Sequence, residues 1–83
     1  MKISFYKVFT RINGQIYFVK WWYNSSLYEE CFRFSTSPIN ASEFNCADTL
    51  HIFEKAAKTS SITFNGVKVS DMKFEFVKFT AEI

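Results

Sequence analysis

The stretch VFTRINGQIYFVKWWY, residues 8–23, gives the clearest indication of the fold. Asn13-Gly14 at its centre suits the two positive-φ positions of a type I′ turn. β-Branched and aromatic residues on both sides favour strands, so the stretch predicts a tight β-hairpin. Because a two-residue turn fixes the pairing register, the residues that face each other across the hairpin can be predicted as well.

The predicted register divides the hairpin into two faces, since successive side chains of a strand point to opposite sides. The inner face has the predicted pairs Ser4/Tyr23, Tyr6/Trp21, Val8/Val19, Thr10/Tyr17 and Ile12/Gln15. The outer face has the predicted pairs Phe5/Trp22, Lys7/Lys20, Phe9/Phe18 and Arg11/Ile16. Both faces are therefore apolar, although an antiparallel sheet covered by one helix commonly has one polar face.

The inner face carries an aliphatic pair and no charge, so we expect it to face the core, with Trp21 inside and Trp22 outside. Like charges directly opposed destabilise a sheet, so Lys7 against Lys20 indicates a site for an acidic partner. The candidate binding residues are Phe5, Lys7, Phe9, Arg11, Phe18, Lys20 and Trp22. In the alternative interpretation, the lysine stems cover the rings and the ammonium groups reach water, or another loop covers the face.

The next part of the chain predicts a turn, a third strand and a loop. Asn24-Ser25-Ser26 is typical of a turn, and a strand is expected over about residues 27–35. This strand places Tyr28, Phe32 and Phe34 on one face, with Cys31 and Arg33 on the other. Residues 35–42 contain the single Pro and several turn-forming residues, which predicts a loop.

An amphipathic helix is predicted over residues 46–58. Cys46, Leu50, Phe53 and Ala57 recur at helical spacing, and Ile52 and Ala56 widen this apolar stripe. Charged residues occupy the remaining positions, with an acid early and lysines late, as the helix dipole prefers. Ser42 or Asn45 is the expected cap at the N-terminal end of the helix.

A second Asn-Gly pair, Asn65-Gly66, predicts a second hairpin. The apolar residues around it alternate with polar ones, as in a half-buried strand. A last strand is expected over about residues 72–81. Its apolar residues change parity between Phe76 and Val77, which predicts a β-bulge or a strong bend at that point.

These elements predict a two-layer α+β fold. One antiparallel sheet of about five to six strands would be packed by a single helix, in the order β-β-β-α-β-β-β. At 83 residues the chain has the length of one small domain, spanning residues 1–83.

Composition and charge limit the classes of partner and compartment. The formal net charge of +2 is too small to indicate nucleic-acid binding by itself. No apolar run reaches the length of a membrane span, and the N-terminus lacks the features of a signal peptide. We therefore expect a cytoplasmic protein, in which Cys31 and Cys46 are two reduced, small apolar residues.

No catalytic, metal or cofactor site is predicted. His51 is the single histidine, and Cys46 is expected on a different side of the same helix. Both glycines belong to predicted turns, which leaves none for a phosphate-binding loop. We therefore expect a protein that is not an enzyme, with Asp48 and His51 exposed to solvent on the helix.

The hypothesis that remains is a protein-binding module whose partner meets the outer face. Frequent Phe, Tyr, Ile, Asn and Lys, which have AT-rich codons, indicate a low-GC genome such as that of a phage or mobile element. By analogy of class, with no matching motif, such a gene can encode an inhibitor of host defence such as an anti-CRISPR. The alternatives are a single-stranded nucleic-acid binder using the aromatic and lysine residues of the same face, and a structural subunit that forms oligomers, including a homodimer.

Overall fold

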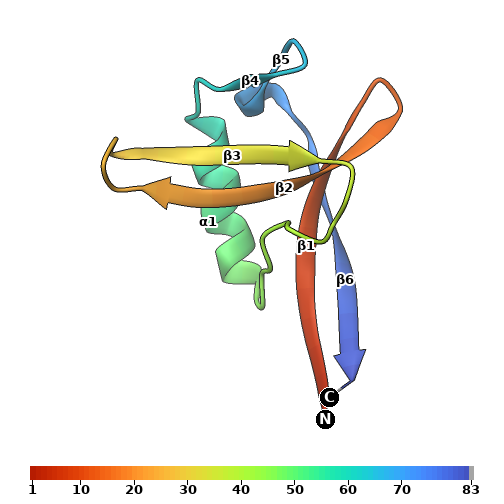
Figure 1. Ribbon diagram of the computed structural model, residues 1–83. Coiled ribbons are helices and arrows are strands. Elements are labelled where there is room, and N and C mark those ends of the chain that lie inside the picture. Colours follow the sequence, from red (N-terminus) through yellow and green to blue (C-terminus); the bar gives the residue numbers. More distant parts are fainter. Residues whose placement is uncertain (83) are drawn as a thin grey trace.

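The computed structural model describes residues 1–82 and confirms the α+β class and the element order β-β-β-α-β-β-β (Figure 1). The helices are α1 (Ala47–Lys58) and the short 3₁₀ helix η1 (Val69–Asp71). The strands are β1 (Lys2–Ile12), β2 (Gln15–Asn24), β3 (Glu29–Ser35), β4 (Thr63–Phe64), β5 (Val67–Lys68) and β6 (Phe74–Glu82).

The six strands form two sheets instead of the one that was expected. Four strands make an antiparallel sheet in the order β3-β2-β1-β6, and β4 pairs with β5 alone. The small hairpin is held to the larger sheet by its side chains, because the Phe64 ring stacks on Phe34 and meets Tyr17 edge-on. Ring packing therefore takes the place of strand pairing at this junction.

Both Asn-Gly pairs form the predicted turns. Asn13 and Gly14 have φ angles of 51° and 80°, and Asn65 and Gly66 have φ angles of 50° and 79°. Positive φ at both central positions is the requirement of a type I′ turn, whose twist matches that of the flanking strands. The local chemistry of the chain thus fixes both hairpins.

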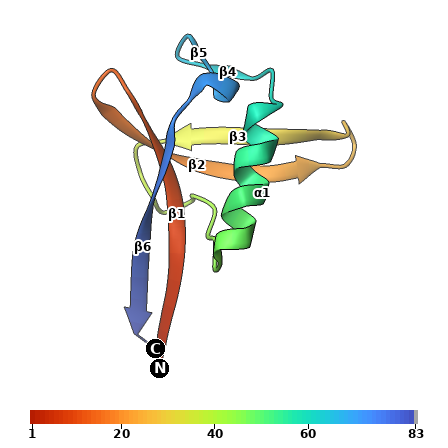
Figure 2. The same ribbon diagram turned by 180° about the vertical axis from the view of Figure 1, so that it is seen from behind.

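The four-stranded sheet separates into two ladders that cross each other. β1 pairs with β2 only from Phe9/Phe18 to the turn. β1 pairs with β6 from Lys2 to Thr10, and β2 pairs with β3 from Phe18 to Asn24. Figure 1 shows β2 and β3 running across the direction of β1 and β6. Figure 2, the view from the opposite side, shows α1 in front of β2 and β3. We call these two parts the β1/β6 ladder and the β2/β3 ladder.

The predicted register of the first hairpin is therefore wrong beyond Phe9 and Phe18. The expected pairs Ser4/Tyr23, Phe5/Trp22, Tyr6/Trp21, Lys7/Lys20 and Val8/Val19 do not belong to the β1–β2 register.

Residues 36–46, the connecting segment, bind to both strands where β1 and β2 diverge. Tyr6 and Phe44 exchange two backbone hydrogen bonds, of 2.6 and 2.8 Å. Ser42 donates its backbone N–H to the Val19 carbonyl, and its hydroxyl binds the backbone of Trp21. Backbone groups left unpaired by the divergence of the strands gain partners in this way, as buried polar groups require.

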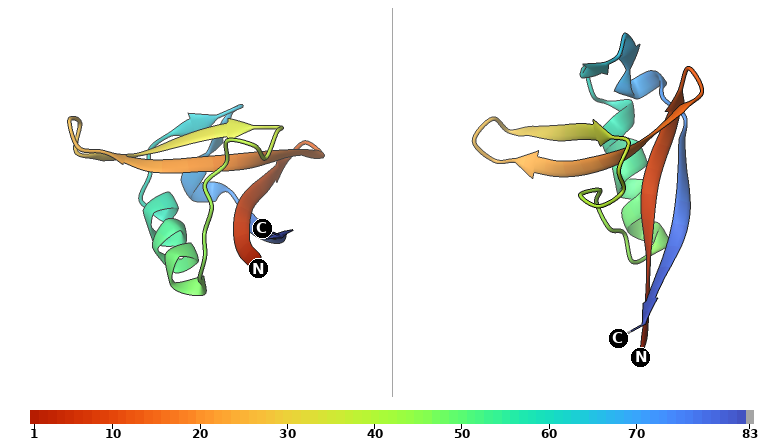
Figure 3. Two further views of the ribbon diagram at one scale, coloured as in Figure 1. Left: turned by 60° about the horizontal axis from the view of Figure 1, so that its bottom comes forward. Right: turned by 45° about the vertical axis from the view of Figure 1, so that its right-hand side comes forward.

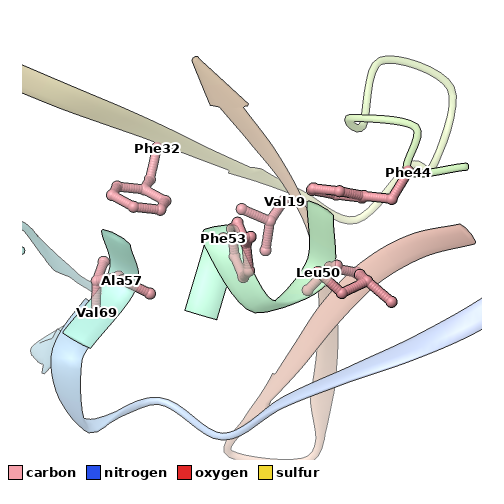
Figure 4. Close-up of a cluster of buried hydrophobic side chains, with 8 residues drawn as sticks. Val19, Phe32, Phe44, Leu50, Phe53, Ala57 and Val69 are labelled. Carbon is pink, nitrogen blue, oxygen red and sulfur yellow. The ribbon is translucent and has the colours of Figure 1, made fainter. Parts of the chain in front are cut away.

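The core lies between the inner face and α1 (Figure 3). Leu50, Phe53 and Ala57 of the helix are buried, as predicted, and Val8 and Val19 of the inner face lie opposite them. Phe53 lies inside the cluster, with Ala57 and Val69 toward one end and Phe44 and Leu50 toward the other (Figure 4). The inner face is thus the core face, in agreement with the sequence-based expectation.

Several details of the helix differ from the prediction. Cys46 and Ile52 are exposed, so the buried stripe is narrower than the apolar pattern suggests. Cys46 is itself the N-cap residue, in place of Ser42 or Asn45, and its carbonyl accepts a hydrogen bond from the Thr49 hydroxyl. Ser42 is instead engaged with β2, which removes it from the helix end.

Two details of the strands also differ. Tyr28 does not share a face with Phe32, because it lies in the turn before β3 with a φ angle of 54° and is exposed. The bulge predicted between Phe76 and Val77 is absent, since β6 pairs with β1 in one unbroken register. Both residues are exposed, so the change of parity reflects apolar residues on both faces of the β1/β6 ladder.

Candidate binding surface

The outer face of the four-stranded sheet is the side away from α1. Within residues 1–82, the helix and the small hairpin both pack on the inner face, and the connecting segment approaches the outer face at its middle. The register extends the outer face onto β3, through Cys31 and Arg33, and onto β6, through Val77 and Phe79.

The prediction that Lys7 belongs to an exposed binding surface and faces Lys20 is wrong, because Lys7 is buried and lies outside the β1–β2 register. Its side chain is 7% exposed, and its Nζ donates a hydrogen bond to the Pro38 carbonyl. The ammonium group also lies 5.8 Å from the centre of the Phe5 ring and 5.9 Å from that of Phe79. Lys7 therefore holds the connecting segment to the sheet and is not part of an exposed binding surface.

The outer-face phenylalanines are half-buried by contact with neighbouring rings. Phe5 stacks on Phe79 at 5.8 Å, and Phe9 lies against Phe18 at 5.9 Å. Packing of this kind stabilises a face that no helix covers. These rings form an apolar floor and leave only part of their surface for a partner.

Arg11 is exposed but already has an anionic neighbour. Its Nε lies 2.9 Å from Oε2 of Glu75, and its guanidinium group lies 5.7 Å from the centre of the Phe9 ring. Both side chains of this ion pair are more than half exposed, so its contribution to stability is small. The charge of Arg11 is nevertheless balanced within the protein.

The β2/β3 ladder carries the exposed cations that lack such a neighbour. Lys20 lies directly opposite Arg33, and within the described chain neither has a carboxylate at ion-pair distance. The Arg33 guanidinium lies 5.8 Å from the ring centre of Trp22, which is 38% exposed. The predicted pair of opposed cations therefore exists, with Arg33 in the place assigned to Lys7.

Arg33 was missed because the sequence prediction paired only the first two strands. The signal was present, however. The turn at residues 24–26 and the alternation of β3 place Arg33 on the face opposite Phe32 and Phe34, which is the outer face. The pairing of Arg33 with Lys20 depends on a longer turn than the predicted one, because the structure places Asn24 opposite Glu29.

Two shallow depressions adjoin this pair of cations. One is lined by Lys20, Trp22 and Arg33, and the other shares both cations and reaches the connecting segment. The additional residues that line the second depression are Phe18, Ser35, Ser37, Asn40 and Ala41. Neither depression is lined by an acidic residue, so cations, neutral hydrogen-bonding groups and aromatic rings surround the space.

The carboxylates of the outer face lie farther along its strands. Glu29 begins β3, four residues before Arg33, and Glu75 lies on β6 beside Arg11. Glu75 is balanced by Arg11, so of these two carboxylates Glu29 is the one whose charge is not compensated by an ion pair within the described chain. This distribution favours a compact anionic group over an extended chain of negative charges.

The residues considered for catalysis lie on the helix, away from the outer face. Cys46 is exposed at the first turn of α1, where the backbone N–H and then the hydroxyl of Thr49 lower the pKa of its thiol. Asp48 and His51 are exposed on the same helix. Nowhere in residues 1–82 do three or more His, Cys, Asp or Glu side chains gather as metal ligands would.

None of the helices in the described chain has the length and apolar character needed to cross a membrane. Comparisons with family models, curated proteins and solved structures give no match for the chain.

Proposed function

We propose that this protein is a binding module without catalytic activity, and that its outer face docks on another protein. The observation that carries the proposal is the β2/β3 ladder, where Trp22 and two unpaired cations are exposed beside an apolar floor. Tryptophan and arginine are the residues that most often dominate the energy of protein interfaces.

The arrangement of charge supports a protein partner with an acidic surface. Opposed cations cost stability in a sheet unless something compensates them, and a carboxylate from a partner does so. The high content of residues with AT-rich codons suits an inhibitor encoded by a phage or mobile element. A host defence protein is therefore the partner class to test first.

The test is capture of a partner from the lysate of a low-GC bacterium, with and without nuclease. We expect a nuclease-resistant protein to bind the wild type and to be lost with Trp22→Ala. The matched control is Tyr23→Ala, because Tyr23 is a neighbouring ring on the inner side and is 55% exposed. Capture that is equal for both variants would place the binding surface elsewhere.

A nucleic-acid partner would give a different result in the same experiment. Binding through stacking on Trp22 and phosphate contacts would be lost on nuclease treatment and would fall steeply with salt. Retention only in the absence of nuclease would replace the present proposal by that alternative.

A further inference from the structure

We propose that Lys20, Arg33 and Trp22, with the adjoining edge of the connecting segment, receive an acidic side chain that lies next to an apolar one in the partner. This inference rests on the proposed function and names the chemistry of the partner segment. Arg33 is the principal residue of the site, since its guanidinium can bind a carboxylate through two parallel hydrogen bonds.

The positive charges of Lys20 and Arg33 favour the binding of an anionic group. Lys20 and Arg33 are cross-strand neighbours on an exposed surface, and both depressions beside them lack acidic residues. By contrast, Arg11, the other exposed cation among the candidate binding residues, has Glu75 at 2.9 Å. An incoming carboxylate would relieve the repulsion between the paired cations and satisfy donors that the fold leaves free.

The rings of Trp22 and Phe18 favour an apolar side chain next to that carboxylate in the partner. Trp22 presents an exposed ring beside the Arg33 guanidinium, and Phe18 lines the second depression. A carboxylate bound by Arg33 would bring an apolar side chain on the same side of its segment within reach of these rings. Burial of that side chain adds a hydrophobic contribution that a free anion lacks.

The connecting segment forms one wall of the site and is held in place. Lys7 binds the Pro38 carbonyl from the sheet side, and Ser42 binds the backbone of β2. Ser37 and Asn40 lie on this wall and carry neutral hydrogen-bonding groups. A wall fixed before binding lowers the ordering cost that the partner would otherwise have to offset.

An extended polyanion fits this surface less well. A single strand of nucleic acid that follows the β2/β3 ladder would place phosphates toward Glu29, at the start of β3. Among the outer-face rings in residues 1–82, Trp22 is exposed whereas Phe5, Phe9, Phe18 and Phe79 are half-buried, and strand binders use a series of exposed rings. The charges therefore favour a single carboxylate.

The test is an NMR titration with two blocked peptides of equal length, one alternating Asp and Leu and the other alternating Asn and Leu. The indole N–H of Trp22 reports on the site. The indole N–H of Trp21 is an internal reference, because it donates to Glu30 at 2.7 Å on the inner side. We expect saturable shifts at Trp22 and at the Arg33 side chain with the Asp-Leu peptide, and little shift at Trp21.

Charge variants show whether the cations are responsible. Lys20→Gln with Arg33→Gln should weaken binding of the Asp-Leu peptide by about tenfold or more, as expected when hydrogen bonds to a charged group are lost. Lys55→Gln with Lys68→Gln makes the same change in net charge at exposed positions elsewhere and should leave binding unchanged. Dispersed amide spectra of both variants confirm that they fold.

Three outcomes would overturn the inference. Equal shifts with the Asn-Leu peptide would show an apolar site without a carboxylate requirement. Tighter binding of a short oligothymidylate would identify a nucleic-acid site. Loss of the captured partner on Trp22→Ala but not on the double cation variant would leave the proposed protein-binding function intact and reject the acidic segment alone.

Discussion

The two ladders of the sheet use their outer-face cations in different ways. In the β1/β6 ladder, Lys7 is buried against Pro38 and Arg11 pairs with Glu75, so both charges have partners within the protein. In the β2/β3 ladder, Lys20 and Arg33 face each other without an acid at ion-pair distance in the described chain. Outer-face cations thus contribute to the fold in one ladder and, within residues 1–82, lack an internal ionic partner in the other.

The strongest way to break the comparison is to remove the side chain that joins the ladders. Phe53 is 1% exposed, and its ring meets Trp21 and Phe32 of the β2/β3 ladder and Phe74 of β6. Phe53→Ala should cost about 3–5 kcal/mol, as large-to-small core changes do. The free energy of unfolding of small domains can be as low as about 5 kcal/mol, so this variant should be largely unfolded.

Urea unfolding followed by circular dichroism measures this effect. Ile52→Ala is the matched control, because Ile52 is the neighbouring helix residue and is 57% exposed. A Phe53→Ala midpoint close to that of the control would mean that the two ladders do not depend on a shared core.

The neighbouring tryptophans separate the two faces of the β2/β3 ladder. Trp21 stacks on Phe44, meets Phe53 edge-on and donates to Glu30, whereas Trp22 is on the exposed side. Trp21→Ala should therefore cost about 3 kcal/mol or more of unfolding free energy, and Trp22→Ala less than about 1 kcal/mol. The same urea measurement on both variants decides the assignment, and a reversed order would exchange the two faces.

The local features of the fold could be predicted from the sequence, and the divergence of the ladders could not. Asn13-Gly14 and Asn65-Gly66 determine their turns through their own backbone preferences, and Leu50 and Phe53 show the helix through their spacing. The β1–β2 register fails beyond Phe9 because Phe44 and Ser42, distant in sequence, bind the strands where they would otherwise pair. The alternation of apolar residues in the hairpin does not show that a distant segment competes for the backbone groups of its strands.

The candidate site shows the same limit. Exposure of Trp22 followed from its position next to Trp21, so it could be predicted. The positions of Lys7 and Arg33 depended on the connecting segment and on the register of a third strand. The sequence thus predicted that Lys20 faces another cation, but it assigned Lys7 of β1 to that position instead of Arg33 of β3.

Substitution of Lys7 and of Lys20 compares a buried cation that stabilises the fold with an exposed cation that does not. The Lys7 stem is buried, and its ammonium group has the Pro38 carbonyl as a hydrogen-bond partner. Lys7→Ala should lower the unfolding free energy by about 1–3 kcal/mol, since a charged hydrogen bond and stem packing are lost. Lys20→Ala should change it by about 0.5 kcal/mol or less. Equal effects in urea unfolding would contradict the buried position of Lys7.

The smallest effect is the most specific, because the two ladders should respond to loss of charge with opposite signs. Arg11→Gln removes an attraction to Glu75 and should destabilise the protein by about 0.2–1 kcal/mol. Arg33→Gln removes the repulsion from Lys20 and should stabilise it by a similar amount, about 0.2–1 kcal/mol.

Both changes remove one positive charge from an outer-face arginine that lies over an aromatic ring, so they form a matched pair. Thermal unfolding at low and high salt measures the difference, which should shrink as salt screens exposed charges. A double-mutant cycle of Lys20→Gln and Arg33→Gln should give a repulsive coupling in the wild type. An attractive or absent coupling would mean that the two cations do not repel each other in solution, and the physical reason for an anionic partner at this ladder would then be lost.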